Sequence, residues 1–226
     1  TYFASDISYH LDKYDRGYKR IINVWGADHH GYVPRMEAVL EAMEFSKDVF
    51  KVALVQFVTL KRGGEKAQMS TRSGEFITLS EVVDEVGVDA ARFFFLMRSA
   101  DSHLDFDLEL AKQKSNDNPV FYVQYAHARI CSVFQTAVDS TVKTSTINEA
   151  NLSLFGEDEI DLAKKVLAFP GVVEKAAESL EGHRITYYLQ ELSSNFHSYY
   201  RKNRVVTEDV PLTLARLALL DCVRNV

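Results

Sequence analysis

Cysteine is scarce in this chain: only Cys131 and Cys222 occur among its 226 residues, and they form no Cys-x-x-Cys pair. That spacing excludes a disulfide framework and a cysteine-based zinc fold, so we expect two buried thiols in a reducing compartment. Proline and glycine are also few, with four and ten residues, which excludes collagen-like and low-complexity chains.

Long apolar runs are missing as well. No stretch approaches the roughly 20 apolar residues that a membrane span needs, and no secretory signal pattern is present. The net charge is only −6, so a nucleic-acid partner has to be held by local basic patches instead of the field of the whole protein. The 46% hydrophobic content predicts a globular chain with one large core or two modest ones, and the length slightly favours two.

The first half of the chain alternates helix and strand patterns. Four side chains recur at helical spacing and share one face of the first helix: Tyr2, Asp6, Tyr9 and His10. The expected elements are a helix at 2–14, a strand at 20–26, an amphipathic helix at 35–45 and a β-branched strand at 51–60. This order predicts a parallel α/β sheet.

Further helices follow the second strand. Thr78 and Glu81 fit a capping box that begins a helix, and Gly87 fits the left-handed position that ends it. The apolar stretch 89–100 predicts another helix. The first half is therefore expected to be α/β, with a partial parallel nucleotide-binding sheet.

From Asn118 onward the pattern is purely helical. Asn118 as a cap and Pro119 in the first turn begin a long helix over 119–138. A polar loop or flexible linker follows at 139–151. Helices are expected at 157–169, 171–181, 184–203 and 211–226. Since no strand pattern interrupts them, the second half is predicted to be an all-α bundle.

The stretch "GADHHG" has three interpretations. A metal site built on Asp28, His29 and His30 is disfavoured, because neighbouring residues point apart and no zinc-type spacing is present. In the second interpretation, both are ordinary loop histidines that contact solvent or the backbone. The position favours a third interpretation, since open α/β sheets bind ligands at the carboxyl ends of parallel strands. There Gly26 permits close approach and Asp28 accepts hydrogen bonds from a ribose.

A glycine-rich basic loop follows the second strand. Four cationic side chains surround its Met-Ser core: Lys61, Arg62, Lys66 and Arg72. Backbone N–H groups and cations in such a loop cradle phosphates and stabilise the charge that develops in phosphoryl or adenylyl transfer. The alternative is a mobile, solvated loop.

Five motifs taken in order resemble the class I arginyl-tRNA synthetases, and more narrowly the bacterial type. They are "TYFASDISYHLDKY", "VWGADHHGYVPRM", "AQMSTRSGEF", "ARFFFLMRSADSHLDFD" and "NPVFYVQYAHARI". The resemblance covers essentially the whole chain. It implies that residues 1–117 are the C-terminal part of a Rossmann-type catalytic domain, with its Met-Ser-Thr-Arg-Ser loop and connecting helices. Residues 118–226 then form a helical anticodon-binding domain that stops before its natural end.

The resemblance assigns roles to individual residues. It implies that Tyr2, Asp6 and His29 bind arginine, and a carboxylate such as Asp6 suits a planar guanidinium. Tyr9 and His10 are expected to have a packing role. The ATP-binding set is Gly26, Asp28, Gln68, Met69 and Ser70, and the catalytic loop residues are Met69, Ser70 and Arg72.

Two departures from the family pattern stand out. Gln68 and Thr71 occupy the positions of the loop lysines, which leaves Arg72 and Lys66 as candidates to meet the ATP phosphates. The family's His-x-Gly-His motif is absent from this chain. Because that motif lies upstream in the family, half of the phosphate site is expected to be missing.

In the helical half, two pairs place a tyrosine and an arginine four residues apart. Tyr125 with Arg129 and Tyr200 with Arg204 suit stacking and clamping of an unpaired base, and the resemblance implies tRNA binding there. The alternative is that the tyrosines are bundle core. Residues 119–226 hold eleven cationic and thirteen acidic side chains, so RNA affinity depends on a local basic surface made of Arg201, Lys202 and Arg204.

The sequence therefore predicts a C-terminal piece of a cytoplasmic, monomeric arginine–tRNA ligase. The expected partners are arginine, its tRNA and ATP with Mg²⁺, with no membrane and no tightly bound protein metal. The chain opens without methionine and ends inside a helical pattern, which predicts a fragment of a longer protein. Because the His-x-Gly-His motif is missing, this fragment is expected to be inactive alone. The alternatives are a non-catalytic RNA-binding fragment and a metal hydrolase built on the "GADHHG" stretch.

Overall fold

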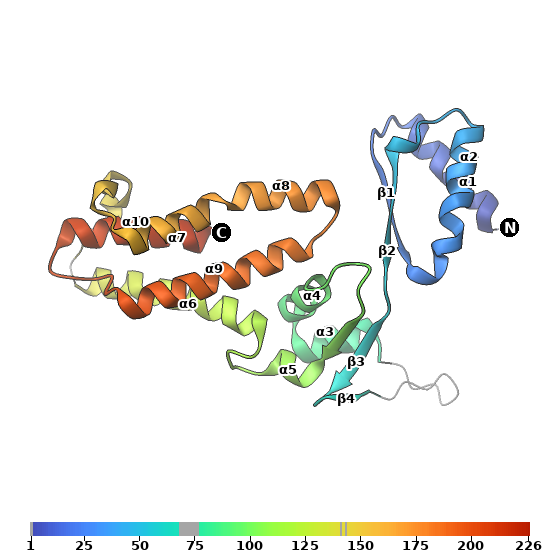
Figure 1. The fold of residues 1–226 in the computed structure, drawn as a ribbon. Helices are drawn as coiled ribbons and strands as arrows, with labels where there is room; N and C mark the ends of the chain where they lie inside the picture. The colour runs from blue at the N-terminus through green and yellow to red at the C-terminus, as the bar shows by residue number, and fades with distance from the viewer. Residues whose placement is uncertain (1, 68–76, 141, 143) are drawn as a thin grey trace. The chain divides into compact units, whose positions relative to one another are not determined.

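The computed structural model describes residues 2–67, 77–140, 142 and 144–226 (Figure 1). Two compact units each hold their own internal contacts. Unit 1 comprises Thr1–Leu60 and Arg98–Phe106, and unit 2 comprises Lys61–Met97 and Asp107–Val226. The sequence predicted a boundary between two domains at residues 117 and 118. These two units do not test that boundary, so it stays a prediction.

Unit 1 contains the expected alternation of helices and strands. Its elements are α1 (Tyr2–Asp15), β1 (Ile21–Gly26), the 3₁₀ helix η1 (Ala27–Tyr32), α2 (Val33–Ala42), the short η2 (Lys47–Val49) and β2 (Phe50–Val55). β1 and β2 are parallel, with Ile21 opposite Phe50 and Gly26 opposite Val55. Met36 and Leu40 of α2 join Ile21 and Phe50 in a core, so the predicted strand–helix–strand order and its parallel pairing are confirmed.

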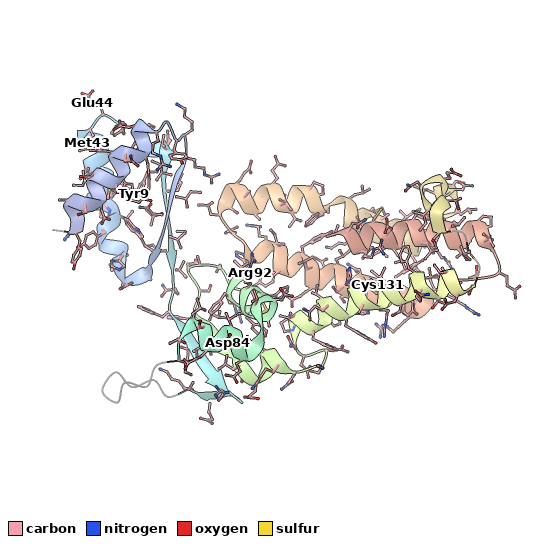
Figure 2. All side chains as sticks on the ribbon, turned by 180° about the vertical axis from the view of Figure 1, so that it is seen from behind. Tyr9, Met43, Glu44, Asp84, Arg92 and Cys131 are labelled. Carbon is pink, nitrogen blue, oxygen red and sulfur yellow. The ribbon has the colours of Figure 1, made fainter. Side chains whose placement is uncertain are left out.

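A buried polar pair attaches α1 to β1. The Asn23 amide lies 2.8 Å from Nε2 of His10, and Nδ1 of His10 lies 2.7 Å from the Asp6 carbonyl oxygen. The ring therefore donates from Nδ1 to Asp6 and accepts at Nε2 from Asn23. Both His10 and Asn23 are buried, which confirms a packing role for His10. Tyr9, in contrast, is 58% exposed beneath the Lys13 ammonium group (Figure 2).

The single strand predicted at 51–60 is wrong, because the chain forms two strands there. β2 ends at Val55, and β3 (Val58–Arg62) lies in a different sheet, between β4 (Glu65–Lys66) and β5 (Leu104–Asp107). Between them, the Gln56 N–H donates to the Ala100 carbonyl oxygen at 2.8 Å. No glycine or proline marks this break, so only the choice of pairing partner reveals it. The short strand β5 was not predicted from the sequence.

Three short helices of unit 2 precede its bundle: α3 (Leu79–Val86), α4 (Val88–Leu96) and α5 (Leu108–Lys112). The predicted capping box is confirmed, because the Thr78 hydroxyl accepts from the Glu81 N–H and the Glu81 carboxylate accepts from the Thr78 N–H. Gly87 has φ 84° and ψ 156°, so its φ is positive as expected but its ψ is not left-handed helical. It links α3 directly to α4, and α4 ends at Leu96, earlier than predicted.

A bundle of long helices forms the rest of unit 2 (Figure 1). Its members are α6 (Pro119–Asp139), α7 (Glu157–Leu167), α8 (Phe169–Ser179), α9 (His183–Lys202) and α10 (Val210–Asn225), with 3₁₀ turns η3 (Thr144–Glu149) and η4 (Leu152–Leu154) in the predicted polar loop. The Asn118 carboxamide oxygen accepts from the Val120 N–H, which confirms the predicted cap. α9 packs on α6, α7 and α8, and fully buried side chains such as Phe196 and Leu220 form the core.

A buried ion pair joins three helices of the bundle. The Glu159 carboxylate of α7 accepts from Nε of Arg216 in α10 at 2.8 Å and from the Tyr199 hydroxyl of α9 at 3.1 Å. Only 4% of the Glu159 side chain and 14% of the Arg216 side chain are exposed. Burial, followed by the Glu159 charge, raises the pKa of the Tyr199 hydroxyl, so Tyr199 stays protonated and donates.

The prediction of two buried thiols is wrong. Cys131 of α6, labelled in Figure 2, and Cys222 of α10 are both exposed and free. The core face of α6 carries Ile130 and Val133, so Cys131, one residue after Ile130, is turned about 100° away from it. No helix in the described part of the chain is long and apolar enough to cross a membrane.

Candidate functional site

The carboxyl end of β1 delivers Gly26 and Asp28 to one turn. Gly26 is the last residue of β1, and Asp28 lies in the first turn of η1. A Cβ atom added at Gly26 would lie 2.5 Å from Oδ1 of Asp28. The carboxylate therefore folds back over the strand end, and a larger residue at position 26 would displace it. The structure brings these two predicted ribose-binding residues together at the edge where parallel sheets bind ligands.

Aromatic contacts bring the start of α1 to the same end of unit 1. The Phe3 ring of α1 lies 6.0 Å from the Tyr32 ring, and the His29 ring lies 6.1 Å from Tyr32 on the other side of the η1 turn. Tyr2 and Asp6 flank Phe3 on α1 and are exposed, Tyr2 by 93%. The predicted arginine-binding residues thus lie on two elements that meet at Tyr32.

The two adjacent histidines point to different partners. His29 Nε2 lies 3.7 Å from the Asp28 carboxylate, whereas His30 Nδ1 lies 3.1 Å from the Ala27 carbonyl oxygen. Among the described residues, no group of three or more histidine, cysteine, aspartate or glutamate side chains could hold a metal ion. This geometry gives no support to a metal hydrolase.

Gln68, Met69, Ser70, Thr71 and Arg72 lie outside the described residues, but the hairpin that leads into them is described. The Asp107 carboxylate accepts from the N–H groups of Gly63 at 3.1 Å and Gly64 at 2.7 Å. Burial raises the pKa of Asp107, but the backbone N–H donors, Gly64 foremost, outweigh it and lower the pKa overall. The hairpin is therefore fastened to the start of α5.

An ion-pair network supports the same hairpin. Arg62 of β3 donates both terminal nitrogens to the Glu85 carboxylate of α3, and Lys112 of α5 reaches Glu85 and Glu109 at 2.8 Å. Hydrogen bonds from Arg62, then Lys112, lower the pKa of Glu85 to about 2. Arg62, predicted as part of a phosphate-binding basic cluster, is thus neutralised by carboxylates, while Lys66 of β4 is exposed.

In the bundle, one guanidinium connects two of the predicted tyrosines. The Arg129 guanidinium of α6 lies 4.5 Å from the Tyr125 ring centroid and 5.2 Å from the Tyr200 ring centroid of α9. It also donates to the Tyr125 hydroxyl. Tyr125 is 38% exposed, so the cluster of Tyr125, Arg129 and Tyr200, here called the tyrosine–arginine cluster, reaches the surface.

Arg204 does not belong to this cluster as the sequence spacing suggested. α9 ends at Lys202, so Arg204 lies beyond the helix, and Tyr200 contacts Arg129 across the two helices instead. Arg204 lines a cavity of about 440 Å³ together with Tyr200, Arg201 and Lys202. Its carbonyl oxygen accepts from the largely buried Arg216 at 2.7 Å.

Residues 123–226 match the DALR anticodon binding domain family. The chain is 56% identical over its whole length to the arginine–tRNA ligase of Syntrophotalea carbinolica, and 57% identical over 99% of its length to that of Citrifermentans bemidjiense. The chain is therefore similar to arginine–tRNA ligases along its whole length. It spans 41% and 40% of those two relatives, in their carboxy-terminal part.

A solved structure gives the same result for the fold. The crystal structure from Campylobacter jejuni described as an arginyl tRNA synthetase superimposes on 99% of the chain with a TM-score of 0.88 at 39% sequence identity. The chain covers 49% of that structure. The arrangement of an α/β part followed by a helical bundle is therefore that of the synthetase family.

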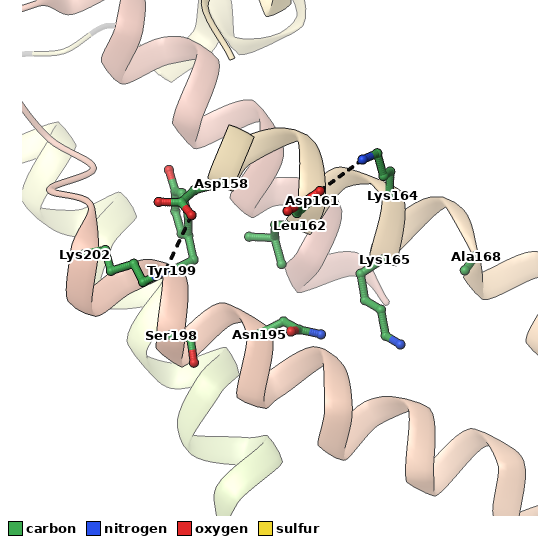
Figure 3. A pocket seen from close by; sticks show the side chains of 10 residues that line it. All are labelled: Asp158, Asp161, Leu162, Lys164, Lys165, Ala168, Asn195, Ser198, Tyr199 and Lys202. Atoms are coloured by element: carbon green, nitrogen blue, oxygen red, sulfur yellow. Dashed lines mark hydrogen bonds and ion pairs between the residues drawn. The ribbon is translucent and has the colours of Figure 1, made fainter. Parts of the chain in front are cut away.

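A second cavity in the bundle is lined by side chains of both charges (Figure 3). It lies between α7 and α9, measures about 460 Å³, and is lined by three lysines. Lys164 pairs with Asp161 at 3.0 Å, Lys202 lies 3.7 Å from Asp158, and Lys165 pairs with Glu191. Because each lysine faces a carboxylate, this cavity favours an anionic ligand less than the one beside Tyr200.

The sequence did not single out one residue that the structure places in the tyrosine–arginine cluster. His197 of α9 is 7% exposed, and its Nδ1 lies 3.2 Å from a terminal nitrogen of Arg129. Its ring lies 4.8 Å from the Tyr122 ring and 5.6 Å from the Tyr125 ring. The signal available in the sequence was helical spacing, because His197 precedes Tyr200 by three residues.

Proposed function

We propose that this chain contributes both the arginine-side pocket and the anticodon-reading surface of an arginine–tRNA ligase. In that reaction an oxygen of the arginine carboxylate attacks the α-phosphorus of ATP, the bond to pyrophosphate breaks, and an arginyl-adenylate forms. The tRNA 3′ end then takes the arginyl group and AMP leaves. The proposal draws on the names of the relatives at 56% and 57% identity, and on the two sites above.

On the unit 1 side, charge and geometry support the roles that the family resemblance implies. Asp6 suits the guanidinium of arginine, since a carboxylate gives it charge-assisted, bidentate hydrogen bonds. Tyr2 lies on the same helix face, and His29 approaches from η1 next to Tyr32. Asp28, folded over Gly26, is the acceptor for a ribose hydroxyl of ATP and of the adenylate.

The loop completes the proposed chemistry. Gln68, Met69 and Ser70 bind ATP, and Met69, Ser70 and Arg72 stabilise charge on the phosphates as pyrophosphate leaves. Magnesium arrives as part of the substrate, bound to ATP phosphates and not held in a protein cage. The protein acts as a monomer in the cytoplasm.

The observation that carries the proposal is the tyrosine–arginine cluster inside the region that matches an anticodon binding domain. Aromatic rings offer stacking surfaces to unpaired bases, and a guanidinium adds a cation–π partner and hydrogen-bond donors to base edges or phosphate. Arg201 and Arg204 beside Tyr200, together with Lys202, which also faces Asp158, supply the local positive charge that an overall acidic chain needs.

The test measures binding and catalysis on the same 226-residue chain. We expect it to bind arginine tRNA more tightly than a tRNA with a substituted anticodon, at fixed salt. We also expect no exchange of pyrophosphate into ATP in the presence of arginine and tRNA, because the His-x-Gly-His phosphate motif is absent from the sequence. Measurable turnover would overturn the prediction of inactivity, and equal binding of both tRNAs would overturn anticodon reading.

The alternative is a non-catalytic RNA-binding fragment whose bundle is the working part. The tyrosine–arginine cluster lies entirely within the bundle, which supports RNA binding by the bundle without catalysis. The two proposals separate when the upstream segment of a relative, such as that of Citrifermentans bemidjiense, is supplied on a separate chain. Restored pyrophosphate exchange that Asp6→Asn abolishes supports the ligase role, and tight RNA binding without any restored exchange supports the alternative.

A further inference from the structure

Beneath the tyrosine–arginine cluster lies a histidine whose ring is enclosed by aromatic side chains. His197 is 7% exposed, and it contacts the rings of Tyr122, Tyr125 and Phe196 at centroid distances of 4.8, 5.6 and 5.4 Å. The three rings leave its imidazole little room to rotate. Such burial of a polar ring is costly unless its nitrogens find partners.

The ring orientation determines which nitrogen meets Arg129. Nδ1 lies 3.2 Å from a terminal nitrogen of Arg129. A guanidinium only donates hydrogen bonds, so Nδ1 is the acceptor and the ring proton is on Nε2. Nε2 is buried without a hydrogen-bond partner in the described part of the chain, so the contact with Arg129 is the hydrogen bond that fixes the orientation of the ring.

The surrounding charges keep the ring in the accepting form. Burial is the largest effect that lowers the pKa of His197, and the charges of Arg129 and Arg201 lower it further, against an opposing contribution from the Tyr122 backbone. At neutral pH the imidazole is therefore neutral, with its Nδ1 lone pair directed at Arg129.

This contact has a consequence for Arg129. The hydrogen bonds to His197 and to the Tyr125 hydroxyl hold the guanidinium by its two terminal nitrogens, while the Tyr125 and Tyr200 rings contact it. A guanidinium has five N–H donors, and these two bonds use two of them. The remaining donors are oriented before any ligand arrives, which reduces the ordering cost of binding.

We propose that His197 is a positioning residue for RNA binding: it accepts a hydrogen bond from Arg129 and presents the remaining donors of that guanidinium to an unpaired nucleotide. This rests on the proposed function, because it takes the tyrosine–arginine cluster as the RNA-binding surface. His197 itself does not touch the nucleotide.

Two substitutions separate the acceptor from the ring. His197→Phe keeps an aromatic ring between Tyr122 and Tyr125 but removes the acceptor. His197→Asn removes the ring but retains an oxygen near the position of Nδ1. If positioning is the role, H197F weakens binding of the 226-residue chain to arginine tRNA about tenfold and lowers its preference for the correct anticodon. H197N then binds more tightly than H197F, although it has lost more packing.

The measurements are the tRNA dissociation constant at fixed salt, the ratio between correct and substituted anticodons, and the unfolding midpoint. Arg129→Ala is tested in parallel. Unchanged binding in H197F together with weakened binding in R129A overturns the positioning role while leaving the proposed function intact. If R129A also binds normally, the tyrosine–arginine cluster is not the RNA surface and the proposed function fails at this site. A purely structural role predicts the reverse order, with H197N worse than H197F in both binding and unfolding.

Discussion

At the scale of single residues, Arg129 contributes most to the proposed RNA site. From α6 it reaches α9 through the Tyr200 ring and the His197 imidazole, and it also contacts the Tyr125 ring of its own helix. The sequence pairing of Tyr125 with Arg129 was correct as a contact, because residues four apart on a helix are neighbours. The second pairing failed because a helix end, which the spacing argument did not take into account, falls between Tyr200 and Arg204.

We therefore expect Arg129→Ala to weaken binding of arginine tRNA by about 1–3 kcal/mol, the range for losing a guanidinium that hydrogen-bonds a base. Arg129→Lys should lose most of the same amount, because an ammonium group cannot lie flat against two rings. The measurement is a tRNA titration at constant ionic strength. Arg184→Ala is the matched control, since Arg184 carries the same charge in the same bundle but pairs with Glu181. Equal losses in both variants would show a nonspecific charge effect.

Glu85 gives a pH-dependent prediction. Its pKa is lowered from 4.5 to about 2 by hydrogen bonds from Arg62 and Lys112, so the folded state holds the charged form more strongly than the unfolded chain does. The resulting stabilisation is complete above about pH 4.5 and is lost as the pH falls toward 2. Wild-type protein should thus be more stable than Glu85→Gln at pH 7, and the difference should shrink steadily from pH 4.5 to pH 3. A difference that is independent of pH in chemical denaturation would contradict this.

At the scale of elements, sequence patterns predicted helices better than strands. The capping box of Thr78 and the Asn118–Pro119 start were readable because caps are local chemistry. The division of 51–60 into β2 and β3 was not readable, because each half pairs with a different distant strand. The buried ion pair was not readable either, because Glu159 lies on α7 and Arg216 lies on α10.

Glu159→Gln should destabilise the bundle by roughly 3 kcal/mol or more, since it leaves the Arg216 charge buried beside a neutral partner. Combining Glu159→Leu with Arg216→Met should recover much of that loss, because an apolar pair of similar size fills the same space. Urea unfolding of the three proteins measures this. If Glu159→Gln causes no loss of stability, the ion pair is hydrated and the prediction is wrong. The carbonyl of Arg204 also loses its Arg216 donor in the double variant, so tRNA binding there is a separate readout.

At the scale of the whole molecule, the two units differ in how much apolar surface they cover. Unit 1 contains the two-stranded pair β1–β2, in which Ile22 is 42% and Val24 69% exposed. The bundle of unit 2 buries a continuous core that includes Ile130, Phe196 and Leu220. Two strands with an open face provide little stability by themselves.

Hydrogen exchange should reveal this difference directly. Backbone amides of β1 and β2 are expected to exchange faster than those in the core turns of α6 and α9, because local opening costs less where fewer apolar side chains are buried. Adding arginine tRNA should slow exchange near Tyr125 and Tyr200 and leave β1 unchanged. Equal protection of both units in the free chain would contradict the prediction.

Sequence patterns alone were enough to predict the similarity to arginine–tRNA ligases, the helices with strong caps, the parallel pairing of β1 with β2, and the turn that joins Gly26 to Asp28, because each depends on local patterns or ordered motifs. Tertiary structure alone decided three things: the break between β2 and β3, the exposure of both cysteines, and the assembly of Arg129 with Tyr200 and His197. The physical reason is the same in each case. Which strand pairs, which helix face is covered and which rings enclose a guanidinium depend on residues far apart in the chain, and sequence spacing does not encode those distances.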